Sequence, residues 1–139
     1  MTHSFAEGGR VLRHDHAMFR FWCNKPPREE AAIKDWIKRL ISAIDMVLVA
    51  GPVAHYVHEL GNKGLTATAC IATSHIAIHI WDEPYPAMCD LDVYTCSELH
   101  IEAVLKMIKE FEPTKIQWKL LDRDTGFEDV SGGVINGRL

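Results

Sequence analysis

Residues 66–96, TATACIATSHIAIHIWDEPYPAMCDLDVYTC, are the stretch that decides the fold of this chain. Within residues 74–81, isoleucines alternate with two histidines, an alanine and a tryptophan, which is the period of a β-strand with two different faces. The flanking segments, bounded by Gly, Pro and small polar residues, predict further strands over 65–73 and 90–96. Because the connections are short, the three strands are expected to form an antiparallel meander.

The segments around this meander predict two helices and more strands. Apolar residues three and four positions apart predict a helix over about 28–44, with Pro27 suited to its first turn. A second amphipathic pattern begins after Ser97, a possible N-cap, and stops before Pro113. The remaining strands are expected over residues 17–23, 46–50 and 115–121, with 53–60 continuing as extended chain.

Two amphipathic helices and one sheet predict an α/β (α+β) fold, a two-layer sandwich with a mainly antiparallel sheet and both helices on one face. A second copy of the chain could cover the other face, so a homodimer is expected. At 139 residues the chain fits one domain, which we place at 15–122. Residues 1–14 are interpreted as a flexible arm, and the polar, Gly-rich residues 123–139 as a tail that wraps the surface or frays.

Composition excludes several classes of partner. A formal charge of −4 provides no basic field for a phosphate backbone, so no nucleic-acid partner is expected. No apolar run is long enough to span a bilayer, so no membrane partner is expected. The four cysteines show no close ligand pairs and the N-terminus lacks an apolar signal core, which favours reduced thiols in a cytoplasmic protein without a metal site.

The residues alone leave the chemistry open. His75 and His79 share the strand face opposite the isoleucines, and two histidines on one strand are more often structural than catalytic. His55 and His58 lie in a segment that Gly51-Pro52 makes extended, which favours solvated or hydrogen-bonded side chains over a metal pair.

The motifs of the central stretch narrow these alternatives. A small-residue strand containing Thr66 is followed by Ser74-His75, Ile78-His79 and Trp81, and then by the strand 92–96, DVYTC, which precedes a helix. This pattern, with the order of elements from about residue 14 to 122, resembles the small bacterial and archaeal S-adenosylmethionine decarboxylases.

The resemblance implies a self-processing enzyme with a covalent pyruvoyl cofactor. Cleavage between Thr73 and Ser74 would give fragments 1–73 and 74–139, with the pyruvoyl group formed from Ser74. His79 would move protons, Thr66 matches a family serine that assists processing, and Cys96 matches the acid that returns a proton to the substrate.

The substrate implied by the resemblance is S-adenosylmethionine, decarboxylated for spermidine synthesis. Aromatic character suggests Phe19, Phe21 or Tyr85 for stacking on the adenine, and Glu83 is a further candidate substrate contact. One alternative keeps the cofactor and changes the substrate to arginine or ornithine. Another is an unprocessed homologue that binds a ligand or a partner without catalysis.

Two departures from the family pattern motivate the arginine or ornithine alternative. The residue before the serine is usually glutamate in this family, and here it is Thr73. The connection between Trp81 and Cys96 is also slightly longer than usual. In addition, an unbroken strand would place Ser74 and His79 on opposite faces, so the backbone is expected to turn or bulge near Thr73-Ser74.

Overall fold

The structure is a computed structural model that describes residues 3–4, 11–124 and 126–137. Its described elements follow the chain in this order: β1 (His3–Ser4), β2 (Val11–Leu12), β3 (Asp15–Cys23), α1 (Glu30–Ala43), β4 (Leu48–Val57), β5 (Gly64–Ile71), β6 (Ser74–Trp81), β7 (Ala87–Thr95), α2 (Ile101–Ile108), a 3₁₀ turn (Lys109–Phe111), β8 (Pro113–Asp122) and β9 (Glu128–Asn136). No helix within these ranges is long and apolar enough to cross a membrane.

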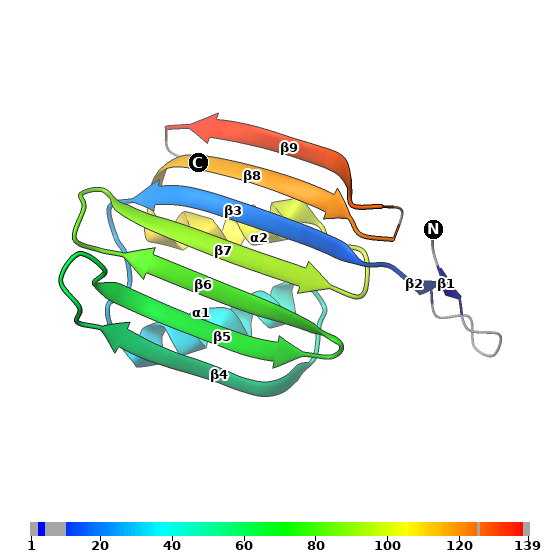
Figure 1. Ribbon diagram of the computed structural model, residues 1–139, viewed down its shortest axis with the longest axis horizontal. Coiled ribbons are helices and arrows are strands. Elements are labelled where there is room, and N and C mark those ends of the chain that lie inside the picture. The colour runs from blue at the N-terminus through cyan, green and yellow to red at the C-terminus, as the bar shows by residue number, and fades with distance from the viewer. Residues whose placement is uncertain (1–2, 5–10, 125, 138–139) are drawn as a thin grey trace.

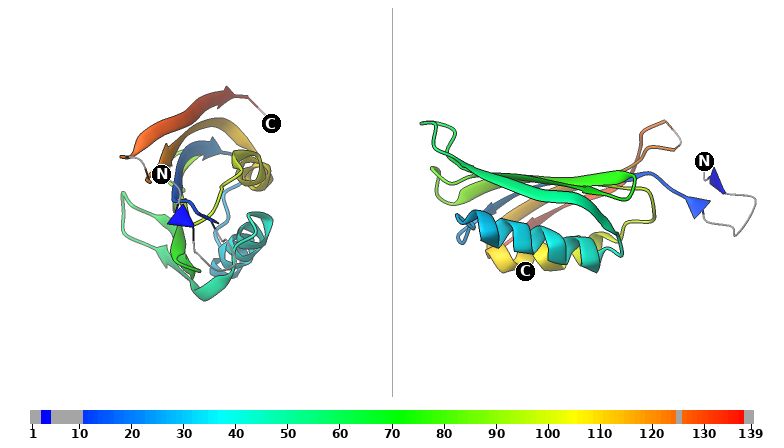
Figure 2. Two further views of the ribbon diagram at one scale, coloured as in Figure 1. Left: turned by 90° about the vertical axis from the view of Figure 1, so that its right-hand side faces the viewer. Right: turned by 90° about the horizontal axis from the view of Figure 1, so that it is seen from below.

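Seven strands form one sheet in the order β4-β5-β6-β7-β3-β8-β9, and every neighbouring pair is antiparallel (Figure 1). Helices α1 and α2 lie side by side on one face of this sheet, and no helix in the described part of the chain covers the other face (Figure 2). The predicted two-layer α+β sandwich is therefore confirmed.

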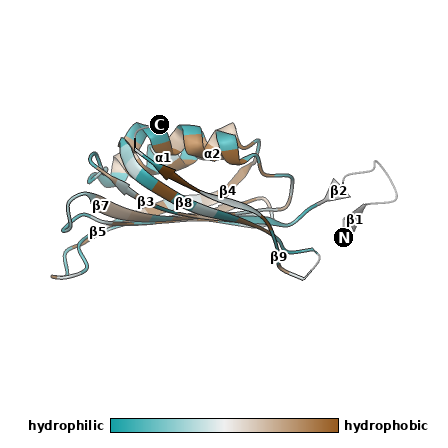
Figure 3. Cartoon of the chain, turned by 90° about the horizontal axis from the view of Figure 1, so that it is seen from above, coloured by the Kyte–Doolittle hydropathy of each residue, from teal (hydrophilic) through white to brown (hydrophobic). Residues whose placement is uncertain are grey.

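The hydrophobic core lies between the sheet and the helices. The isoleucines of β6 at positions 76, 78 and 80 are buried on the helix side. Trp36 of α1 is 2% exposed, and its indole N–H donates a 3.0 Å hydrogen bond to the carbonyl of Met107 at the end of α2. Hydrophobic stretches on both helices are visible in Figure 3. The helix-free side, which we call the open face, carries the intervening residues of each strand, including His75 and His79.

Both helices begin later than the sequence predicted. Helix α1 starts at Glu30 because Glu29 is still extended (φ −94°, ψ 132°), so Pro27 lies before the helix. Helix α2 starts at Ile101 after His100, and Ser97 does not cap it. The Ser97 hydroxyl instead lies 3.4 Å from the sulfur of Met46, so its bond goes to the chain that follows α1.

The tail expectation is wrong for residues 128–136, which form the edge strand β9. This strand pairs with β8 from Lys115↔Asn136 to Asp122↔Glu128. Backbone pairing with β8 satisfies the hydrogen-bonding groups of this segment. Its polar, Gly-rich side chains show no pattern that would predict a strand. In the arm, β1 and β2 form a short antiparallel pair, and residues 1–2 and 5–10 lie outside the described residues.

Candidate active site

The chain turns sharply between β5 and β6, where the sequence predicted a break. Ile71 pairs with Ser74, so Ala72 and Thr73 form a two-residue turn. The turn changes which residues share a face, and Thr66 consequently lies directly opposite His79 on the open face. Ser74 and His79, five residues apart on β6, still face opposite sides of the sheet.

Thr73 holds a strained backbone conformation. Its φ is +55°, in the left-handed region that branched side chains avoid. Conformations of this kind cost on the order of 1–3 kcal/mol and persist where the surrounding structure imposes them. The strained residue is the one immediately before Ser74.

The Ser74 hydroxyl and the Cys96 thiol meet at one main-chain oxygen. The Ser74 Oγ lies 3.4 Å from the carbonyl oxygen of Ala72, and the Cys96 Sγ lies 3.2 Å from the same oxygen. Cys96 is 2% exposed, so its thiol lies at the margin of the core, beside the turn. The Ser74 hydroxyl and the Cys96 thiol are therefore neighbours at this turn.

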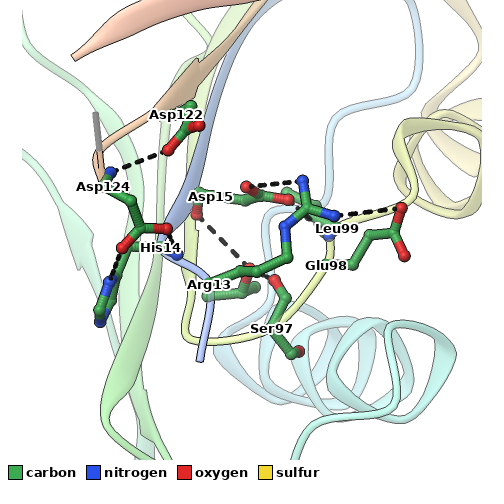
Figure 4. Close-up of polar contacts among 9 residues, drawn as sticks. Arg13, His14, Asp15, Ser97, Glu98, Leu99, Asp122 and Asp124 are labelled. Carbon is green, nitrogen blue, oxygen red and sulfur yellow. Dashed lines mark hydrogen bonds and ion pairs between the residues drawn. The ribbon is translucent and has the colours of Figure 1, made fainter. Parts of the chain in front are cut away.

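A polar cluster around Arg13 and Asp15 fixes the chain at residues 97–99, directly after Cys96 (Figure 4). The backbone N–H of Arg13 donates to the carbonyl of Cys96 at 3.2 Å. The buried carboxylate of Asp15 accepts the backbone N–H of Leu99 at 2.9 Å, and the Arg13 guanidinium lies 3.5 Å from Asp15 and 3.3 Å from Glu98. The start of β3 thus anchors the segment that carries the thiol.

Thr66 and His79 form a second pair away from the turn. The Thr66 Oγ1 and the His79 Nδ1 are hydrogen-bonded at 2.6 Å. Because His79 lies five residues beyond Ser74 on the same strand, about 16 Å of extended chain separates them. A single chain therefore brings Ser74 to Cys96 and Thr66 to His79, but it does not bring the two pairs together.

The predicted substrate contacts fall in two different environments. Phe19 and Phe21 are buried in the core, and Phe21 stacks on Phe111 at 5.8 Å between ring centroids. Their side chains face the helices, which contradicts the prediction that they stack on an adenine. Tyr85 is 83% exposed in the loop between β6 and β7, and Glu83 accepts the backbone N–H of Lys63 at 3.1 Å. This loop follows the His79 end of β6.

On the open face, the carboxylate of Asp92 links three strands, and the sequence did not predict this link. Asp92 of β7 accepts hydrogen bonds from His16 of β3 at 2.6 Å and from His75 of β6 at 3.0 Å. Partial burial alone would raise the pKa of Asp92, but the bonds and charges of the two histidines outweigh it and hold this pKa below the ordinary value. The alternation of His16 and Asp92 with apolar residues was the available signal, but only the β3–β7 register brings them together.

A cavity of about 510 Å³ opens on the same face. Its lining includes His79, Trp118 and the bidentate ion pair of Arg20 with Asp90, whose two N–O distances are 2.6 and 2.7 Å. In the described ranges, no group of three or more His, Cys, Asp or Glu side chains is arranged to hold a metal ion.

The fold and the site define an antiparallel α+β sandwich with a serine directly after a strained turn residue and a thiol beside that turn. Comparison with known proteins identifies the family. The sequence model described as S-adenosylmethionine decarboxylase matches residues 21–124, and the chain belongs to this family.

Several curated proteins named S-adenosylmethionine decarboxylase proenzyme are similar over most of the chain. The protein from Pyrobaculum islandicum is 33% identical over 122 residues, covering 84% of this chain and 92% of its own. The protein from Prochlorococcus marinus is 30% identical over 117 residues, covering 82% and 90%. The protein from Pyrobaculum aerophilum is 33% identical over 93 residues, covering 66% and 70%.

Proposed function

We propose that this chain is a self-processing, pyruvoyl-dependent decarboxylase of S-adenosylmethionine, whose product donates aminopropyl groups for spermidine synthesis. Family membership supports the reaction, and the word proenzyme in the names of its relatives supports processing. The structural observation that carries the proposal is the position of Ser74, after a strained threonine and beside the Cys96 thiol.

The residues at the turn fit the formation of a pyruvoyl group. The Ser74 Oγ would bond to the carbonyl carbon of Thr73 as the peptide C–N bond breaks, and the hydroxyl proton would end on the Ser74 nitrogen. Loss of the Ser74 Cα proton and cleavage of the Cβ–Oγ bond would then release the Thr73 carboxylate. Water would replace the nitrogen, which leaves as ammonia. The left-handed strain at Thr73 favours the first step because breaking the peptide bond relieves it.

The pyruvoyl carbonyl would supply the electron sink for loss of carbon dioxide from an α-amino acid. Cys96 lies at the turn with its thiol directed at the Ala72 carbonyl, so it can hold a proton close to residue 74. We assign to Cys96 the return of this proton to the substrate α-carbon.

A second copy of the chain completes this site. The Thr66–His79 pair is too far from Ser74 to act on it within one chain, yet it faces the sheet surface that no helix covers. Two-fold packing of two open faces would bring the pair of one protomer to the turn of the other, and the reverse. Exposed apolar side chains on that face, including Met18 and Val53, support a homodimer. The expected cytoplasmic location stays a prediction.

The substrate assignment is tested with processed protein and carboxyl-labelled compounds. Release of labelled carbon dioxide is measured from S-adenosylmethionine, arginine and ornithine at matched concentrations. We expect turnover of S-adenosylmethionine alone. Turnover of a basic amino acid in its place would overturn the substrate, and no turnover by fully cut protein would overturn the decarboxylase activity.

A further inference from the structure

Three side chains direct donors at one oxygen atom, the carbonyl of Ala72. The Thr73 Oγ1 lies 2.8 Å from it, the Cys96 Sγ 3.2 Å and the Ser74 Oγ 3.4 Å. The first distance is typical of an O–H···O hydrogen bond, whereas the third is far beyond the usual 2.5–3.0 Å. Of the three donors, the serine hydroxyl is therefore held most loosely.

A carbonyl oxygen offers two lone pairs, so three donors compete for two positions. The short bond from Thr73 takes one position, and the Cys96 thiol takes the other at a distance suited to sulfur. The weak contact of Ser74 is the expected result of this competition. Without the threonine hydroxyl, Ala72 would have a vacant lone pair, and the nearest hydroxyl to fill it is that of Ser74.

This competition matters for the attack on the main chain. To reach the Thr73 carbonyl carbon, the Ser74 hydroxyl must leave the Ala72 oxygen. A tight hydrogen bond to Ala72 would have to be broken first, and its free energy would add to the barrier.

We propose that Thr73 is a positioning residue for self-cleavage, because its hydroxyl occupies the Ala72 carbonyl and keeps the Ser74 hydroxyl available as nucleophile. The inference rests on the proposed cleavage at Ser74. It gives a role to the position where this chain departs from the usual glutamate of its family.

Two matched substitutions separate the hydroxyl from the branched shape of the side chain. Thr73→Val keeps the branching and the volume but removes the donor, whereas Thr73→Ser keeps the donor and removes a methyl group. Thr73 is exposed, so neither change disturbs the core. Thr73→Ala is a second variant without the hydroxyl, and Ser74→Ala is the uncleavable control.

The full chain is freshly refolded, and the rate of cleavage is followed by intact mass. In parallel, hydroxylamine is added, since it cuts the ester that the first step forms and thus reports on that step alone. We expect Thr73→Val and Thr73→Ala to slow both rates about threefold to tenfold, the rate equivalent of one net hydrogen bond. Thr73→Ser keeps the hydroxyl, so both of its rates should stay within about twofold of the wild-type rates. A difference of that size is within the spread of measured free energies for one hydrogen bond.

The possible outcomes separate the role of Thr73 from the proposed cleavage at Ser74. Wild-type rates in both variants that lack the hydroxyl, or an equal loss in Thr73→Ser, would overturn the role of Thr73 and leave cleavage at Ser74 standing. A wild-type chain that never cuts would overturn the proposed function, and the inference with it. Melting temperatures measured in the Ser74→Ala background should agree among the variants, which separates positioning from folding.

Discussion

Ser74 and Cys96 contact the same carbonyl oxygen but are assigned different tasks, and substitution separates them. Ser74→Ala removes the nucleophile, so cleavage should stop completely. Cys96→Ala leaves the hydroxyl and the strained turn in place, so cleavage should continue, slowed by no more than about tenfold because the Ala72 carbonyl loses one donor. Decarboxylation should fall about 100-fold or more, the usual contribution of a general acid. Intact mass and carbon dioxide release measure the two properties independently. Loss of cleavage in Cys96→Ala would place the thiol in processing instead.

Asp92 makes the free energy of unfolding depend on pH. Its pKa is lower in the folded protein than in the unfolded chain, because His16 and His75 outweigh the effect of burial. A group with a lowered folded pKa stabilises the protein above its unfolded pKa of about 3.9, and this contribution is lost as the pH falls through the folded value.

Asp92→Asn should therefore lower the free energy of unfolding at neutral pH by about 1 kcal/mol, given the partial exposure of the pair. Its urea-unfolding free energy should also fall less steeply than that of the wild type below about pH 5. Asp45→Asn, at an exposed position, is the matched control and should follow the wild type. Equal acid dependence in wild type and Asp92→Asn would contradict the assignment.

For single residues, the sequence predicted which side chains are candidates for chemistry more successfully than it predicted where those side chains lie in the fold. Motif spacing selected Ser74 and Cys96, and the structure places them together. The alternation in β3 put Phe19 and Phe21 on one face but did not say that this face packs under the helices. The bond from His16 to Asp92 joins residues 76 positions apart, which no local pattern reveals.

Trp36 joins helix α1 to the end of α2 and the turn that follows it. Its ring is buried against Phe111, with 4.8 Å between centroids, and its N–H bonds to the carbonyl of Met107. Trp36→Ala should lower the free energy of unfolding by about 3–5 kcal/mol, because it leaves a cavity and an unpaired carbonyl. Lys38→Ala, exposed on the same helix, should change it by less than about 0.5 kcal/mol. Chemical denaturation measures both, and similar losses would refute this view of the helix.

Strand β9 packs closely on Trp118 of β8 at Gly133. A Cβ atom at this glycine would lie 2.9 Å from the indole nitrogen, closer than real Cβ atoms approach. Gly133→Ala should therefore destabilise the protein by about 1–3 kcal/mol, whereas Ser131→Ala on the same strand should have little effect. Thermal unfolding compares the two variants. A neutral Gly133→Ala would show that β9 does not dock on the indole ring.

Element by element, periodicity predicted the helices and the central meander because their apolar faces repeat at regular intervals. It failed for β9, whose sequence EDVSGGVIN is polar and Gly-rich, and whose order comes from backbone pairing with β8. It also placed the start of α2 too early, since Asp15, far away in the sequence, takes the backbone N–H of Leu99.

For the whole molecule, the separation of two reactive pairs within one chain is the main argument for a dimer. Ser74→Ala lacks the nucleophile and His79→Ala lacks the imidazole, so neither homodimer should process efficiently. When the two variants are expressed together, mixed dimers should cut the His79→Ala chain, since in the proposed dimer its Ser74 would meet the intact imidazole of the other protomer. Mass spectrometry identifies which chain is cut. An absence of cleavage in the mixture would contradict the shared site.

The proposed activity depends above all on cleavage between Thr73 and Ser74. The most direct measurement is the intact mass of the purified wild-type protein, followed over time after refolding. It should show fragments 1–73 and 74–139, the second with an N-terminal pyruvoyl group and hence lighter than a serine-initiated peptide. A single uncut chain under all conditions would contradict the account.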